Sequence, residues 1–184
     1  MKIKQHLGFL LIAVLLVSAT LIIGFSKMVK AADTGTVAAT VTAIIYSVSL
    51  DNGDGIAFST VGVGSSANTT AGAGGVNDST TATNNGSVSE KLSVKSSNST
   101  GGAGWTMAAA AGSEIYTMKS CITDCDGAAP AWNAFGANAS TYADLAASVG
   151  VGLTQPFDLQ IYTPTATTVT AQQSLTVTVM AGAL

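Results

Sequence analysis

Apolar and polar residues alternate along most of this chain from residue 36 onward, and a period of two predicts β-strands. The longest such stretch, residues 36–50, has small side chains in its first half and bulky ones in its second half. It therefore predicts either two successive strands or one strand with a bulge near residues 43–45. Shorter stretches of the same kind follow, at residues 56–61, 78–83, 88–94, 105–108, 115–118, 157–162 and 175–181.

Turn and loop signals separate these stretches. Asp-Asn-Gly-Asp-Gly at residues 51–55 is typical of a hairpin turn, and residues 62–77 are rich in Gly, Ser, Ala and Thr. Only residues 141–149 favour a helix, of a turn or two at most. About eight short strands with loops between them predict an all-β fold, a single two-sheet antiparallel sandwich of jelly-roll or immunoglobulin-like topology.

Residues 1–31 predict an export leader. Two lysines precede an apolar run at residues 7–25, and Val29 and Ala31 occupy the −3 and −1 places of a small-residue cleavage site. We expect a signal peptide cleaved after Ala31. An uncleaved membrane anchor is the alternative, because the apolar run is near the length of a membrane span. In either case the part of the chain after the leader is exported. We therefore expect the protein outside the cell or at its surface, in contact with a membrane only through the leader.

The composition of the remaining 153 residues argues against several classes of function. They contain no histidine and no arginine, and ten acidic residues against three lysines give a formal charge of −7. Histidine is the usual acid–base group and arginine the usual clamp for phosphate, so no nucleophile–base pair can be named. An acidic surface repels nucleic acid. We therefore expect no enzyme, no cofactor and no nucleic-acid partner, whereas so few charges permit self-association.

Two small clusters suggest local chemistry. Cys121 and Cys125 predict a disulfide that closes a very short loop in an exported protein, with half of a metal site as the alternative. Asp51 and Asp54 are weak calcium candidates, because their spacing does not match an EF-hand loop and a simple turn is the commoner reading.

The asparagines suggest glycosylation. Five of the eight in the exported part stand in Asn-x-Ser/Thr, where chance predicts about two. All five are expected in loops or turns, and the alternative is that Asn, Ser and Thr simply collect there together. The five candidate acceptors are Asn68, Asn77, Asn85, Asn98 and Asn138.

The first residues after the leader, residues 32–43, are the candidate donor strand, and residues 44–184 the expected β-sandwich domain. Val37, Ala39, Val41 and Ala43 put small apolar side chains on one face of a strand with a free end. Such an end can complete an open sheet of another subunit. The alternative is an ordinary first strand of its own domain. Head-to-tail use of a strand gives open filaments unless the rotation closes a ring.

Four short segments resemble small secreted β-sandwich surface proteins of prokaryotes: residues 81–88, 104–106, 157–164 and 174–179. The plan of leader, free N-terminal strand, sandwich and closing strand is similar to the TasA/camelysin class of matrix-fibre proteins and to archaeal bundling pilins. The resemblance implies polymerisation by donor-strand complementation. It transfers no catalytic residues, and the region of Cys121, Cys125 and Trp132 matches no motif of these families.

These observations predict a structural subunit of an extracellular filament or pilus, whose partners are copies of itself. The alternative is a surface adhesin or carbohydrate-binding module, in which Trp132, Phe135 and Tyr142 form a platform for surface glycans rather than plugs over the core. A membrane-anchored surface-layer protein is a third hypothesis if the leader is retained.

Overall fold

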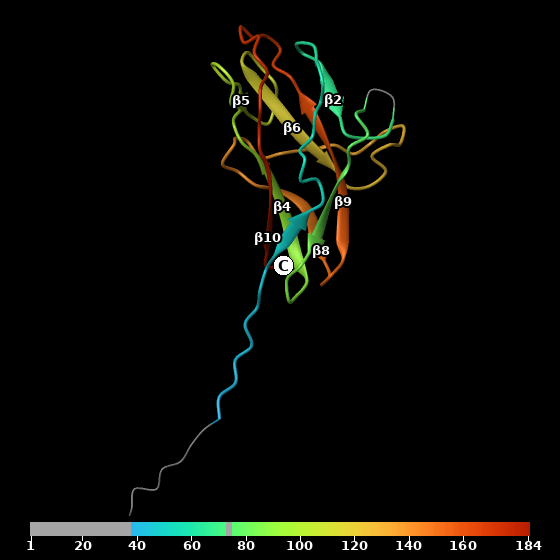
Figure 1. Ribbon diagram of the computed structural model, residues 1–184, viewed down its shortest axis with the longest axis vertical. Coiled ribbons are helices and arrows are strands. Elements are labelled where there is room, and N and C mark those ends of the chain that lie inside the picture. The colour runs from blue at the N-terminus through green and yellow to red at the C-terminus, as the bar shows by residue number, and fades with distance from the viewer. Residues whose placement is uncertain (1–37, 73–74) are drawn as a thin grey trace, which may run out of the picture. The chain divides into compact units, whose positions relative to one another are not determined.

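The structure, a computed structural model, describes residues 38–72 and 75–184, which form an all-β fold (Figure 1). In this part of the chain ten strands make two sheets, and no helix occurs. The larger sheet runs β1 (Val48–Leu50), β3 (Thr80–Asn84), β9 (Thr154–Tyr162), β6 (Ile115–Cys121) and β5 (Thr106–Met107), with β2 (Ser66–Asn68) on β9 and β7 (Asn133–Ala134) on β6. The smaller sheet runs β10 (Val177–Gly182), β4 (Glu90–Ser96) and β8 (Ala143–Val149).

The chain divides after Val41, and the unit Thr42–Leu184 is called the body below. The expected leader, its cleavage after Ala31 and Val37 of the candidate donor strand lie outside the described residues. Within the described ranges, no helix is long and apolar enough to cross a membrane.

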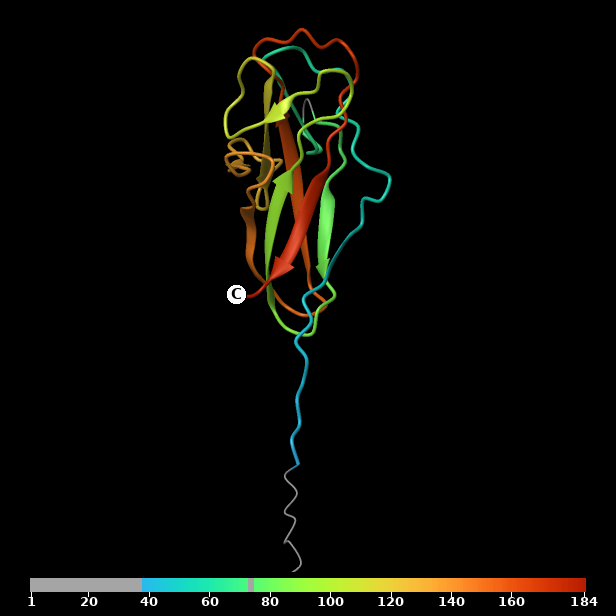
Figure 2. The ribbon, with the colours of Figure 1, turned by 90° about the vertical axis from the view of Figure 1, so that its left-hand side faces the viewer.

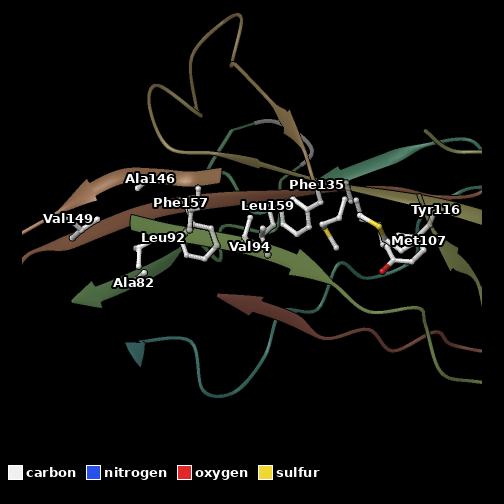
Figure 3. Packing of buried hydrophobic residues seen from close by; sticks show 14 residues of the cluster. Ala82, Leu92, Val94, Met107, Tyr116, Phe135, Ala146, Val149, Phe157 and Leu159 are labelled. Atoms are coloured by element: carbon white, nitrogen blue, oxygen red, sulfur yellow. The ribbon is translucent and has the colours of Figure 1, made fainter. Parts of the chain in front are cut away.

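The two sheets share one hydrophobic core. Phe157 and Leu159 from β9 of the larger sheet pack in the same cluster as Leu92 and Val94 from β4 of the smaller sheet (Figure 3). The alternation of β4 explains its place, because every second side chain from Glu90 to Ser96 is buried. Burial of one face of each sheet against the other is the main stabilising term of such a fold.

The expected helix at residues 141–149 is wrong, since these residues form strand β8 on the edge of the smaller sheet. Three alanines there favour a helix locally. Leu145, Ala146 and Val149 instead reach the core from a strand that pairs antiparallel with β4 and is irregular near Leu92. Tertiary packing outweighs the small differences in helix propensity.

Two predicted strands are shorter than expected or absent. Only residues 48–50 of the stretch 36–50 are a strand in the described chain, and residues 56–61 contain none. Figure 2 shows the latter as part of an irregular teal stretch at the side of the body. Conversely, residues 66–68 of the expected loop 62–77 form β2.

The antiparallel prediction holds for every pair of named strands except β5 and β6, which are parallel. The chain passes β5, turns tightly at Gly112 and Ile115, and re-enters in the same direction. Glu114, with φ of 54°, lies inside this tight turn between Gly112 and Ile115.

Candidate functional site

β1 and β10 are end strands of their sheets and lie on the same side of the body. Each pairs with one neighbour, β1 with β3 and β10 with β4, and no other described strand joins either of them. β1 and β10 also approach one another across this side. An unpaired sheet edge presents free N–H and C=O groups that can pair with another chain.

The hydrogen bonds to β4 decide which groups of β10 are free. Ser97 N–H donates to the Thr176 carbonyl at 2.9 Å, and Val177 lies opposite Ser96 in the antiparallel register. In an antiparallel pair the bonded positions alternate. Thr176 and Thr178 therefore turn their main-chain groups toward β4, whereas Leu175 and Val177 turn theirs away from it.

An apolar groove of about 910 Å³, called the side groove below, lies beside this edge. Phe157, Leu159 and Ile161 of β9 line it together with Trp105, which ties it to the core. Residues 55–61 and residues 169–177 provide further lining. The groove thus brings free main-chain groups and apolar side chains together, which is what an incoming strand needs.

Residues 54–61, beside the side groove, are themselves unpaired. Ile56, Phe58 and Val61 are half-buried against the core, yet the backbone of residues 54–61 makes no hydrogen bond with any other described residue. Ser59 has a φ of 61°, which interrupts an extended conformation. The segment keeps its apolar pattern without a partner strand.

The described part of the candidate donor strand is also unpaired. Ala39, Val41 and Ala43 are exposed and lie in no strand, and Val41 is 97% exposed. The first bond to the body is at Ile45, whose carbonyl accepts from Ser87 N–H at 2.9 Å. None of residues 38–43 belongs to a strand of the structure.

A buried carboxylate fixes the start of the body. Glu90 is fully buried, and its Oε2 accepts from Ser47 N–H at 3.1 Å. Its Oε1 has no hydrogen-bond partner among the described residues. Gly86 packs against this site so closely that a Cβ there would lie 2.5 Å from the Ile45 carbonyl oxygen and 2.9 Å from Glu90 Oε2. Glu90 thus lies on the buried face of β4 with one of its two carboxylate oxygens bonded to Ser47.

Glu114 holds in place a loop that lines the side groove. Its carboxylate accepts from Thr167 Oγ at 2.7 Å and from Thr168 N–H at 2.5 Å. These bonds, led by that of Thr167, lower the pKa of Glu114, because they stabilise the charged form. Since Thr167 lines the groove, the ionised carboxylate keeps this loop in place.

The two calcium candidates, Asp51 and Asp54, lie in a turn. The Asp51 carboxylate accepts from Thr81 N–H at 2.7 Å, and this bond lowers the pKa of Asp51. Asp54 is exposed in the same turn. In the described part of the chain, no three His, Cys, Asp or Glu residues are grouped so that they could hold a metal ion.

Cys121 and Cys125 are joined by a disulfide with Cα atoms 5.7 Å apart, as their spacing predicts. The expectation that all five candidate glycosylation sites lie in loops or turns is wrong for Asn68, which belongs to β2. Its side chain is half-buried and accepts from Thr70 Oγ at 2.7 Å. The other four asparagines are exposed: Asn77, Asn85, Asn98 and Asn138.

The aromatic platform is not assembled as the carbohydrate hypothesis requires. Phe135 is 2% exposed and belongs to the core, while Trp132 and Tyr142 are half-buried. The Lys95 ammonium lies 4.7 Å from the centre of the Tyr142 ring. Only two of the three rings are therefore accessible, and one of them already has a cationic neighbour.

No protein-family model, curated protein or solved structure matches this chain. The resemblance to matrix-fibre proteins and pilins thus stays a prediction. The side groove and the free edge of β10 were not predicted from the sequence. The alternation at residues 175–181 predicts a strand, but it does not show that this strand ends a sheet.

Proposed function

We propose that this protein is a structural subunit of an extracellular filament or pilus, in which residues 32–43 of one copy insert into the side groove of the next. The observation that carries the proposal is the free edge at Leu175 and Val177 beside an apolar groove. The candidate donor segment is the matching half, since its described residues are exposed and unpaired.

The chemistry of the two halves is complementary. The donor segment offers Val37, Ala39, Val41 and Ala43 on one face, small enough to enter beside Phe157 and its neighbours. Full burial of a valine side chain stabilises by about 1.5 kcal/mol, and each main-chain hydrogen bond adds a net of about 1 kcal/mol. Several of both are needed to offset the entropy of ordering the segment.

The order of the strands supports a jelly-roll sandwich as the finer fold. The chain passes from one sheet to the other between β3 and β4 and again between β8 and β9, while β3 pairs with β9 and β4 with β8. Such paired crossings are typical of jelly rolls. An added strand on β10 would extend the smaller sheet from three strands to four.

The donor segment and the side groove are different surfaces, so their contact is heterologous and propagates. The low charge of the exported part limits repulsion between copies. Export by the expected leader would deliver the subunits outside the cell, where the disulfide is stable.

Deletion of residues 32–43 tests the proposal. We expect the shortened exported protein to stay a folded monomer, shown by light scattering and circular dichroism, and to bind a synthetic peptide of residues 32–43. A peptide with Val41→Asp should lose binding, whereas one with Thr40→Asp, changed on the opposite face, should keep it. Normal fibres of the deletion variant in negative stain would refute the proposal.

A further inference from the structure

Three segments meet at the end of the body where the N-terminal chain joins it. The β8–β9 turn is bonded to Asn84, whose N–H donates to the Leu153 carbonyl at 3.0 Å and whose carbonyl accepts from Gly152 N–H at 2.9 Å. The next residue, Asn85, donates its N–H to the Ser47 carbonyl at 2.8 Å. Figure 1 shows the β3–β4 turn (green) and the β8–β9 turn (orange) together at this end.

Five large apolar side chains are exposed on these segments, and together they define the exit face. Their exposed fractions lie between 42% and 61%; the residues are Ile44, Ile45, Tyr46, Val151 and Leu153. No charged residue occurs in residues 42–50, 85–89 or 150–153. A neutral, apolar surface of this kind on an exported protein marks an interaction site rather than a solvated end.

The length of the connector identifies what covers the exit face. The candidate donor segment ends at Ala43, and the body begins to hold the chain at Ile45. Only Ile44 lies between them, and one extended residue spans about 3.5 Å. A body whose donor segment is fully inserted must therefore lie directly against the subunit that accepts it.

We propose that the exit face is a second contact between subunits, in which these side chains pack on the rim of the neighbouring copy's side groove. This inference rests on the proposed function and adds to it. The donor strand provides the link between copies, and the exit face fixes their relative orientation. Val63, which lines the groove and is 57% exposed, offers an apolar position on that rim.

The double variant Val151→Asp/Leu153→Asp in the full exported chain tests the inference. Both side chains are more than half exposed, so the fold tolerates the change. We expect the critical concentration for polymerisation to rise at least tenfold, because two charges would be buried against an apolar rim. Ala129→Asp adds a charge at an exposed alanine of another segment and should polymerise like the unchanged protein.

Binding of the residue 32–43 peptide to the same variants, each lacking its own donor segment, separates the two proposals. Unchanged peptide affinity with impaired polymerisation supports the exit face. Polymerisation equal to that of the Ala129→Asp control overturns it while the donor strand stands. Failure of the peptide to bind even the unchanged body refutes the proposed function, and the exit-face inference falls with it.

Discussion

Replacing Val177 with proline separates the stability of the body from its ability to accept a strand. The main-chain groups of Val177 turn away from β4, and Val177 is one of the residues that line the side groove. Proline has no N–H, but at this position none is used within the described body. Edge strands tolerate proline where the N–H faces outward. We therefore expect Val177→Pro to lower the free energy of unfolding by about 1 kcal/mol, chiefly through lost packing of a half-buried side chain.

The neighbouring Thr178→Pro variant is the matched control. The N–H of Thr178 turns toward Lys95 of β4, so proline there removes a bond of the ladder and leaves a carbonyl without its partner. The expected loss is about 2–4 kcal/mol, which lowers the melting temperature of a body of this size by about 8–16 °C.

Binding of the donor peptide should show the reverse order. In Val177→Pro the pyrrolidine ring occupies the place of the N–H that would meet the incoming strand. A loss of about 1–3 kcal/mol weakens peptide binding by about 5- to 150-fold. Titration by fluorescence anisotropy measures it, and urea unfolding gives the stabilities. Undiminished binding to Val177→Pro would show that the strand does not pair with this edge.

Three further predictions concern the carboxylates and the disulfide. Glu90→Ala should lower the free energy of unfolding in urea by about 2–4 kcal/mol, because it removes the acceptor of Ser47 N–H and leaves a cavity. Glu90→Gln keeps an oxygen there and should change this free energy by no more than about 1 kcal/mol. Equal losses in the two variants would contradict this role. The pKa of Glu114 is lowered in the folded state, so its stabilisation is present above the ordinary value of 4.5 and is lost as the pH falls through the folded pKa. Glu114→Gln should therefore flatten the acid dependence of the melting temperature, and an unchanged slope would contradict it. Reduction of the Cys121–Cys125 bond should lower stability by about 2 kcal/mol, because the closed loop is very short; an unchanged midpoint in reductant would be the contrary result.

Local pattern sufficed for much of the fold. The alternation in β4 and β9 sets which side chains face the core. In a chain without helical periodicity, apolar residues at every second position indicate strands. The disulfide was predicted from the spacing of Cys121 and Cys125 together with the expected export of the chain. Residues 141–149 failed because alanine-rich segments are ambiguous, and pairing with β4 decided their state.

Only the donor segment of the candidate site could be predicted from the sequence. The donor segment is continuous in sequence, so its small apolar face could be recognised from residues 37–43. The side groove joins residues 55–61, 157–161 and 169–177, which only the folded chain brings together. The irregular state of residues 56–61 was equally hidden, since a strand pattern does not reveal whether a partner strand is present.

By itself the sequence determined that the described chain is built from strands with one apolar face, because side-chain alternation is a local property that needs no knowledge of neighbours. The tertiary structure alone decided that β1 and β10 end their sheets, that Glu90 meets Ser47, and that exposed apolar side chains lie on segments joined by hydrogen bonds at the exit face. Which strand lies at an edge depends on pairings between residues far apart in the chain. Those pairings are fixed by how the two sheets bury their common core.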